Sequence, residues 1–490
     1  RPIYDPNHLR KISCVSPDRT AHMLIGLGIK PGDRVALLLM NGAPFYEVYL
    51  ACAELGAVIV PVNWRLVPDE LAYILGDAGA ETLIFDTEFA ALAQALHAGG
   101  KVKVRNWLQV ASDTALEPFA QDYTALAAQG DESEPPRGGF DDDNLYIMYT
   151  SGTTGLPKGV VHSHNTTFWA LSTMITSCDT RLGDRFSVVL PLFHVGALAA
   201  LLLTIYGGGT NVLMRSFDPV GMWRITAEEK ITVTIAVPAM LSFMLQVPGI
   251  DPAGYEQLRW VMSGAAPVPV ALMEKYRDIG IEIHQVYGLT ECCGPGCLIG
   301  PADAMRKIGS TGHAFFHTES RLVNSDGNDV APGEPGEVLL RGGHIMKEYW
   351  NNPTATAETL RDGWLYTGDI AVMDDEGFIT IQDRIKDMII SGGENVYPAE
   401  IENVVLQHPG VKECAVIGVP SERWGESPLV IAVKGDDALS EDDVLKHCDG
   451  KLARFKQPKA AVFVEVIPRN PSGKALKFEL RKQFPGPARE

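Results

Sequence analysis

A glycine- and hydroxyl-rich segment at residues 149–160 is the part of the sequence best suited to chemistry. It reads Tyr-Thr-Ser-Gly-Thr-Thr-Gly-Leu-Pro-Lys-Gly-Val, and apolar residues precede and follow it. This pattern predicts a strand, a loop and a second strand. The loop offers backbone N–H groups, hydroxyls and one lysine, a combination that binds polyphosphates. We therefore predict a phosphate-binding loop made of Thr150, Ser151, Gly152, Thr153, Thr154, Gly155 and Lys158.

The segment differs from a Walker A loop. That motif places Gly-Lys-Ser/Thr at the start of a helix. Here Pro157 precedes Lys158 and Gly159 follows it. Proline lacks an N–H, and Gly159-Val160-Val161 is a poor helix start. We expect a phosphate loop of another kind, and the alternative is a turn between two strands without a ligand.

Alternating strands and helices precede this loop. Continuous apolar strands that alternate with helices indicate a parallel sheet covered on both faces. Residues 111–143 are polar and acidic, which indicates a surface excursion. The expected strands are 34–39, 56–62 and 82–85, and the expected helices are 44–55 and 68–75.

The alternation resumes after the loop and then gives way to a different pattern. An apolar helix is expected at 195–206, with strands at 186–190, 211–214, 233–236, 259–262 and 282–286. Frequent Gly and Pro at 309–365 indicate antiparallel structure. A charged, hinge-like segment at 383–387 precedes a smaller domain with strands at 414–419 and 429–433.

Length and composition describe a globular protein of more than one domain. The chain has 490 residues, 46% of them apolar and 21% charged. Its net charge of −19 argues against a general nucleic-acid or anionic-membrane surface, although a pocket can be locally basic. Eight scattered cysteines without a Cys-x-x-Cys pair predict a reduced, cytoplasmic protein. The cluster Cys292, Cys293 and Cys297 lacks the spacing of a zinc site, so we interpret it as packing.

Membrane and targeting signals are not apparent in the sequence. The most apolar run, residues 195–206, is too short to span a bilayer and ends in three glycines. We expect no transmembrane segment and no signal peptide. Peripheral membrane contact, and a monomeric or homodimeric state, are both compatible with the sequence.

Five motifs follow one another along the chain, at residues 149–159, 287–291, 364–369, 383–398 and 468–474. Together they resemble the adenylate-forming superfamily of acyl-CoA synthetases, luciferases and peptide-synthetase adenylation domains. The chain is most similar to mycobacterial-type fatty-acyl-CoA ligases, from about residue 24 to residue 480. One departure is a shortened segment between Ser16-Pro17 and the turn near residues 24–28.

The resemblance implies the fold and the reaction. The expected α/β fold has a large N-terminal domain, 1–384, of parallel-rich sheets packed with helices plus a distorted antiparallel barrel. A small mobile α+β C-terminal domain, 385–490, would follow. A carboxylic acid would attack the α-phosphate of MgATP, release pyrophosphate and form an acyl-adenylate. The thiol of coenzyme A would then displace AMP.

The resemblance also implies roles for single residues in the first half-reaction. Glu291 matches the magnesium-linked glutamate, and a carboxylate suits a hard cation. Thr290 matches the α-phosphate contact. Lys474 would stabilise the charge that develops on attack, although from the sequence alone it would be a solvated loop lysine. The alternative to a magnesium-linked role for Glu291 is that of a surface residue in a turn.

Nucleotide contacts follow from the same motifs. Tyr287 would lie against the adenine, with core packing as its alternative. Asp369 would accept hydrogen bonds from the ribose hydroxyls, with a helix N-cap as its alternative. Arg384 would be a second ribose or phosphate contact. Small residues would let the base approach the backbone at Gly264, Ala265, Ala266 and Gly288.

The resemblance places a hinge at Lys386, about which the small domain would rotate after adenylation. This rotation would bring Gly392 and Gly393 to the site and leave a channel for the pantetheine arm of coenzyme A. Trp424 could lie along this channel, and the alternative is a tryptophan in the core.

The acyl group would lie near His194, which resembles the family's residue beside the carboxylate; a core histidine is the alternative. The helix after His194, the segment 237–239 and the segment 292–294 could form an apolar pocket. We expect a medium- to long-chain fatty acid. The alternatives are an aryl-propenoic acid, an adenylating enzyme that serves a carrier protein, and, from another class, a non-catalytic nucleotide or acyl binder.

Overall fold

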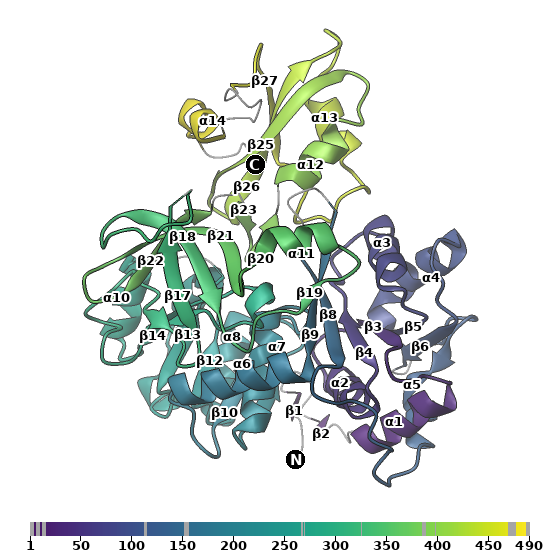
Figure 1. Ribbon diagram of the computed structural model, residues 1–490. Coiled ribbons are helices and arrows are strands. Elements are labelled where there is room, and N and C mark those ends of the chain that lie inside the picture. The colour runs from purple at the N-terminus through teal and green to yellow at the C-terminus, as the bar shows by residue number, and fades with distance from the viewer. Residues whose placement is uncertain are drawn as a thin grey trace. The chain divides into compact units, whose positions relative to one another are not determined.

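A computed structural model describes most of the chain. The chain folds into two compact units (Figure 1). The first unit comprises residues 1–64, 74–149 and 159–383, and the second comprises residues 65–73, 150–158 and 384–490. The described residues are 4–5, 10–11, 16–111, 115–150, 156–265, 268, 270–324, 326–384, 389–396, 398–468 and 477–486.

The first sheet has the strand order β19-β9-β8-β4-β3-β5-β6-β7 within the described ranges. Its centre is parallel: β3 (Arg34–Leu38) pairs in parallel with β4 (Val58–Pro61) and with β5 (Thr82–Asp86). All residues of β4 and β5 are buried, as expected for a sheet covered on both faces. The other strands are β6 (Asn106–Val110), β7 (Gln121–Asp122), β8 (Asn144–Thr150), β9 (Lys158–Ser163) and β19 (Glu348–Tyr349).

The second sheet has the order β16-β15-β14-β13-β12-β10-β11-β1-β2 in the described part of the chain. The run from β11 through β10, β12 and β13 to β14 is parallel, and β15 and β16 continue it antiparallel. The strands are β1 (Tyr4–Asp5), β2 (Arg10–Lys11), β10 (Arg185–Val188), β11 (Thr210–Leu213), β12 (Val233–Ile235), β13 (Trp260–Ser263), β14 (Ile283–Tyr287), β15 (Cys297–Leu298) and β16 (His313–Ala314).

Helices connect and cover the two sheets. One apolar core joins both sheets through α2 (Ala43–Leu55) and α7 (Val195–Tyr206), and a second core packs α8 (Pro219–Glu228) and α9 (Pro238–Leu245) on the other face of the second sheet. The remaining helices of this unit, one of which begins in the second, are α1 (Pro17–Gly26), α3 (Pro68–Ala78), η1 (Thr87–Phe89), α4 (Ala90–Gly99), α5 (Tyr123–Ala128), α6 (His164–Ser177), η2 (Pro252–Gly254), α10 (Val270–Asp278), η3 (Thr290–Cys292) and α11 (Pro353–Thr359).

Most predicted elements are confirmed, with one difference. The apolar helix spans residues 195–206 as predicted, and strands flank the predicted phosphate loop on both sides. The segment 111–143 is more than a surface excursion, because α5 buries Tyr123. The Tyr123 hydroxyl donates to the buried Glu47 carboxylate at 2.9 Å, so this stretch contributes to the core.

A curled antiparallel sheet completes the first unit and confirms the predicted antiparallel region. β18 (Pro335–Arg341) pairs antiparallel with β17 (Glu319–Val323) and with the long β21 (Trp364–Met373). β20 (Leu360–Arg361) and β22 (Ile379–Arg384) add to β21. The predicted class, α/β with parallel-rich sheets and a curled antiparallel sheet, is confirmed.

The second unit has α+β character. β25 (Val411–Ser421) and β26 (Gly425–Lys434) form its long hairpin, and β27 (Ala460–Phe463) joins β26 in parallel. A core of buried Val, Ile and Leu residues lies between this sheet and two helices. The other elements are β23 (Ile389–Ser391), β24 (Glu394–Val396), α12 (Pro398–Val405), α13 (Glu441–His447) and α14 (Lys477–Gln483).

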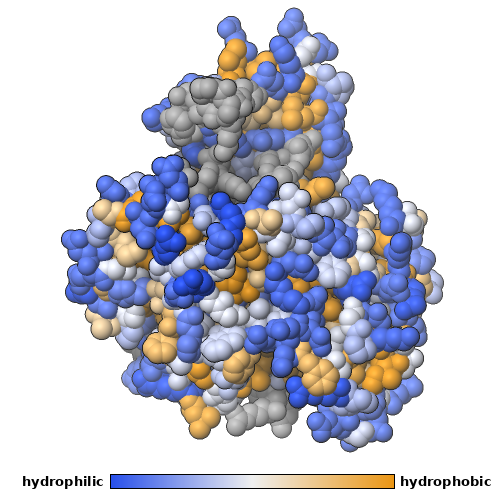
Figure 2. All heavy atoms as spheres, in the orientation of Figure 1, coloured by the Kyte–Doolittle hydropathy of each residue, from blue (hydrophilic) through white to orange (hydrophobic). Residues whose placement is uncertain are grey.

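Hydrophilic residues predominate on the face shown in Figure 2, and hydrophobic ones occur there in small separate groups. Among the described helices, none combines the length and the apolarity that crossing a bilayer requires.

Candidate active site

The predicted site residues gather at the carboxyl ends of parallel strands in the second sheet. β10, β12, β13 and β14 run in the same direction, so their carboxyl ends share one edge. In open α/β sheets this edge is where ligands bind. The residues at or after these ends are His194, Gly264, Ala265, Tyr287, Gly288, Thr290 and Glu291.

The turn after β13 brings two backbones close together. A Cβ at Gly264 would lie 2.5 Å from the carbonyl oxygen of Val286, so only glycine fits here. Ala265 has a φ of +66°. This left-handed conformation is unfavourable for any residue that has a side chain. The close approach at Gly264 and the left-handed backbone at Ala265 are compatible with the prediction that the adenine base approaches the backbone at this turn. Ala266 lies outside the described residues.

The loop after β14 folds back on itself and fixes Thr290 and Glu291. A Cβ at Gly288 would overlap the carbonyl oxygen of Gly294 at 1.6 Å, so the return requires glycine. The Cys293 N–H donates to the Thr290 carbonyl at 3.0 Å and closes the turn. Cys293 is buried, and burial raises the pKa of its thiol to about 11. The thiol therefore stays protonated near neutral pH and serves packing.

Two hydrogen bonds hold Glu291, one at its side chain and one at its backbone. The Tyr349 hydroxyl donates to Oε1 of Glu291 at 2.7 Å, and the Met346 N–H donates to the Glu291 carbonyl at 2.8 Å. Within the described ranges, no three His, Cys, Asp or Glu side chains gather as a metal cage. Magnesium is commonly held by one carboxylate together with phosphates and water, so Glu291 fits this ion.

Two predicted nucleotide contacts touch each other. The Tyr287 hydroxyl donates to Oδ2 of Asp369 at 2.7 Å, and both side chains are buried. Burial, together with the Asp369 carboxylate, holds the pKa of Tyr287 well above its ordinary value. Asp369 lies within strand β21, so the alternative of a helix N-cap is wrong. The pair joins the second sheet to the antiparallel sheet.

His194 occupies the N-cap position of α7 and is half-buried. Its ring lies 4.5 Å from the ring of Phe193, and the Phe193 ring in turn lies 5.9 Å from the ring of Trp64. One turn into the helix, the Cβ of Ala199 would lie 3.3 Å from a Cβ placed at Gly294. Small apolar residues of α7 therefore face the loop that carries Thr290 and Glu291.

The second unit holds the predicted coenzyme A segment. Gly392 and Gly393 form the turn between β23 and β24, with φ of +61° and +82°. The Gly392 N–H donates to the Trp424 carbonyl at 2.8 Å, and a Cβ at Gly392 would lie 2.9 Å from the Trp424 ring. Trp424 is 37% exposed, so the alternative of a core tryptophan is wrong.

Several predicted residues fall at or beyond the edge of the described chain. Thr150 ends β8 and Lys158 begins β9. Arg384 ends β22, and only its backbone is described. Outside the described residues lie Ser151, Gly152, Thr153, Thr154, Gly155, Lys386 and Lys474.

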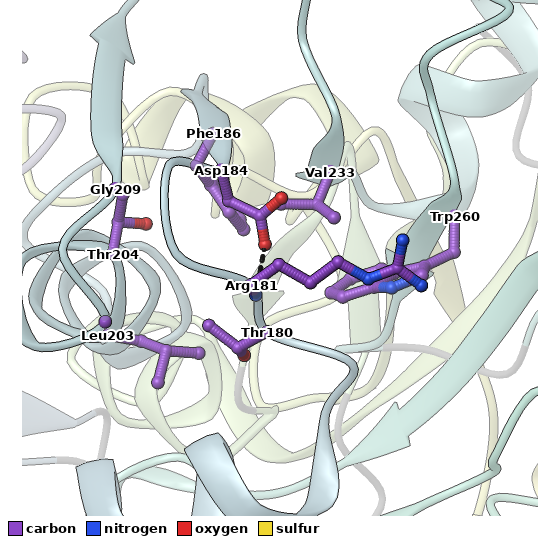
Figure 3. A pocket seen from close by; sticks show the side chains of 10 residues that line it. Thr180, Arg181, Asp184, Phe186, Leu203, Thr204, Gly209, Val233 and Trp260 are labelled. Atoms are coloured by element: carbon purple, nitrogen blue, oxygen red, sulfur yellow. Dashed lines mark hydrogen bonds between the residues drawn. The ribbon is translucent and has the colours of Figure 1, made fainter.

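A small pocket lies at the opposite edge of the second sheet (Figure 3). Phe186, Val233 and Trp260 line it from the amino ends of β10, β12 and β13. At its rim the Arg181 N–H donates to the Asp184 carboxylate at 2.7 Å. No predicted site residue lines this pocket, so it is separate from the candidate active site.

The sequence prediction missed Tyr349 and His162. Tyr349 holds the Glu291 carboxylate, and Nε2 of His162 lies 2.8 Å from the Thr290 carbonyl oxygen. The available signal for His162 was a polar residue within the apolar strand that follows the phosphate loop. Tyr349 had no comparable signal.

Comparisons with known proteins agree with this geometry. Residues 17–350 match the family of AMP-binding enzymes, and residues 400–474 match the C-terminal domain of AMP-binding enzymes. The chain is 44% identical to the long-chain-fatty-acid–CoA ligase FadD13 of Mycobacterium tuberculosis, over 95% of this chain and 91% of that protein. It is 41% identical to a feruloyl-CoA synthase of Amycolatopsis, over 95% and 92%.

A solved structure supports the same relation. An o-succinylbenzoate CoA synthetase variant of Bacillus subtilis, bound with a product analogue, superposes with a TM-score of 0.85 at 32% identity. The match covers 95% of this chain and 91% of that one.

Proposed function

Because the chain belongs to the AMP-binding enzyme family and is an AMP-forming acyl-CoA ligase, we propose that it activates medium- to long-chain fatty acids. Enzymes of this class use ATP, Mg²⁺ and coenzyme A. The fatty carboxylate attacks the α-phosphorus of ATP, and pyrophosphate leaves. The sulfur of coenzyme A then attacks the acyl carbon, AMP leaves, and the thiol proton goes to solvent.

The apolar face of α7 carries this proposal. Residues 195–203 have no polar side chain, and Val195 and Ala199 lie against the loop at Gly294. A fatty chain gains free energy by leaving water for such a surface. The ring hydroxyl of an aryl-propenoic acid would need a hydrogen-bond partner that this helix face does not offer.

We assign to the site residues the roles that their sequence motifs imply. Glu291 supplies an oxygen ligand for Mg²⁺, and Thr290 meets the α-phosphate. Asp369, held by Tyr287 at 2.7 Å, meets the ribose. Residues 150–158 bind the departing pyrophosphate, and Lys474 stabilises the charge that develops on attack.

We further propose that residues 385–490 form the moving domain and that the protein is cytoplasmic. The gap between the two family matches, residues 351–399, contains the proposed boundary. The seven cysteines in the described ranges are all free thiols, which favours a reducing compartment.

A panel of acids tests the substrate. Wild-type protein is incubated with ATP, Mg²⁺, coenzyme A and one of butyrate, octanoate, palmitate, stearate, ferulate or indoleacetate, and AMP is quantified. We expect kcat/KM to rise from butyrate towards palmitate and stearate. A clear preference for ferulate would favour the aryl-propenoic alternative. Equal rates with a carrier protein in place of coenzyme A would favour a carrier-directed enzyme.

A further inference from the structure

The short turn at Thr290 and Glu291 is held from outside by two side chains. The Tyr349 hydroxyl donates to the Glu291 carboxylate at 2.7 Å. Nε2 of His162 lies 2.8 Å from the Thr290 carbonyl oxygen. Since a carbonyl oxygen only accepts, Nε2 must carry the hydrogen of this bond. The side chains thus fix the two consecutive residues that the proposed function places at phosphate and metal.

Both side chains come from one pair of strands. β9 and β19 are antiparallel, and Tyr349 lies directly opposite Val160. Opposite residues share a face of the sheet, and so do residues two apart on one strand. Tyr349, Val160 and His162 therefore point to the same face. We call this face of β9 and β19 the platform.

Neighbouring residues hold the His162 and Tyr349 side chains of the platform in place. His162 is fully buried, and its Nδ1 lies 3.1 Å from the Thr166 hydroxyl oxygen at the start of α6. Thr166 takes part in the capping box of that helix with Ser163. Burial lowers the pKa of His162 to about 4, so the ring is neutral near pH 7. Tyr349 is also buried, in an apolar cluster with Val160 and Tyr287.

The hydrogen bond from Tyr349 orients the Glu291 carboxylate and leaves one of its oxygens free to bind a cation. Its Oε1 accepts from Tyr349, and among the described residues no other side chain bonds to the carboxylate. Oε2 is therefore available to a cation. A hydrogen bond to a charged acceptor is stronger than a bond between neutral groups. The Tyr349 hydroxyl therefore restricts the orientation of the Glu291 carboxylate.

We propose that Tyr349 and His162 are positioning residues that aim Glu291 and Thr290 at Mg²⁺ and the α-phosphate. Tyr349 acts on the carboxylate, and His162 acts on the backbone of the turn. The proposal rests on the proposed function. It states that Glu291 binds the metal ion more tightly with the platform than it would without it.

Metal binding tests the Tyr349 part directly. Mn²⁺ replaces Mg²⁺ as a paramagnetic probe, and its binding in the presence of a non-hydrolysable ATP analogue is followed by electron paramagnetic resonance. Loss of one hydrogen bond to a charged group should weaken Mn²⁺ binding about tenfold or more in Tyr349→Phe. The Mg²⁺ concentration for half-maximal adenylation should rise by a similar factor.

Tyr276→Phe is the matched control. Tyr276 is fully buried, and its hydroxyl donates to the Leu241 carbonyl at 2.8 Å, away from the turn. This variant loses a buried hydroxyl of the same kind, so we expect a similar loss of stability with unchanged Mn²⁺ binding. Equal Mn²⁺ binding by Tyr349→Phe and Tyr276→Phe would overturn the role of Tyr349.

Two substitutions at His162 separate positioning from packing. The side-chain amide of His162→Gln can still donate to the Thr290 carbonyl, whereas His162→Leu cannot. We expect His162→Gln to retain most of the adenylation kcat and His162→Leu to lose about tenfold or more, with KM for the acid unchanged in both. Equal kcat values for the two variants would overturn the role of His162.

Failure of the platform proposal and failure of the proposed function give different results in these experiments. A wild-type protein that forms AMP, with all variants alike in metal dependence and kcat, would leave the proposed function standing and refute the platform. A wild-type protein that forms no AMP with any acid would refute the proposed function; if it also fails to bind Mn²⁺ with the nucleotide analogue, the platform proposal falls as well.

Discussion

Gly392→Ala tests the prediction that coenzyme A passes the turn between β23 and β24. Gly392 has a φ of +61°, and a Cβ there would lie 2.9 Å from Cε3 of Trp424. Real Cβ contacts are longer, so either the ring or the turn must move. Trp424 is 37% exposed, and we expect its ring to move because water borders it.

The free-energy cost of this substitution is small. A left-handed alanine costs about 1 kcal/mol relative to glycine. Such a loss leaves a domain of ordinary stability folded. If the pantetheine arm passes this turn, transfer of the acyl group from acyl-AMP to coenzyme A should slow about tenfold or more, because a misplaced wall near the reacting groups has large kinetic effects. Adenylation should be unchanged.

Gly450→Ala controls for the backbone cost alone. Gly450 belongs to the same unit and has a φ of +71°, but a Cβ there meets nothing within 4 Å. Pyrophosphate exchange measures adenylation, and single-turnover transfer from preformed acyl-AMP measures the second step. Equal transfer rates for Gly392→Ala and Gly450→Ala would refute the assignment of this turn to the coenzyme A path.

Three further predictions concern other parts of the protein. Lys474→Ala should abolish acyl-AMP formation but spare thioester formation from supplied acyl-AMP; equal losses in both steps would show that Lys474 has a different role. Tyr287→Phe removes a hydrogen-bond donor from the buried Asp369, so the Kd for ATP, measured by isothermal titration, should rise about tenfold; the free energy of unfolding, measured by urea denaturation, should fall by about 1–3 kcal/mol. His344 is fully buried, and burial lowers its pKa from 6.5 to about 4. Between these two pH values the unfolded chain binds a proton at His344 that the native protein does not bind, so the free energy of unfolding should fall as the pH is lowered from 6.5 to 4. At about 1.4 kcal/mol per pKa unit, His344→Gln should remove about 3 kcal/mol of this fall. Identical dependence of the urea-measured free energy of unfolding on pH in both proteins would contradict the reasoning.

Sequence patterns predicted the layers of the first unit because burial on both faces requires continuous apolar strands. Strand β4 shows this most clearly, since all of its residues are apolar and buried. The excursion at 111–143 was predicted less well. Tyr123 lies in a polar stretch, and it is buried by contacts with residues far away in the sequence, among them the hydrogen bonds of its hydroxyl to Glu47 and Thr20.

The sequence motifs predicted which residues belong to the candidate site, but they did not predict which of these residues contact each other across the fold. The Tyr287–Asp369 bond joins residues far apart in sequence, as does the Tyr349–Glu291 bond. Local composition contains no signal for such pairs, because they depend on how two sheets pack. Trp424 illustrates the same limit, since its place beside Gly392 depends on strand pairing within the second unit.

Product analysis by ³¹P NMR tests the central claim most directly. Wild-type protein is given ATP, Mg²⁺, palmitate and coenzyme A, with controls that lack the acid or coenzyme A. We predict AMP and pyrophosphate in equal amounts, with turnover that requires palmitate and is sustained only when coenzyme A is present. Formation of ADP and orthophosphate, or turnover that does not need the acid, would contradict the assignment as an AMP-forming acyl-CoA ligase.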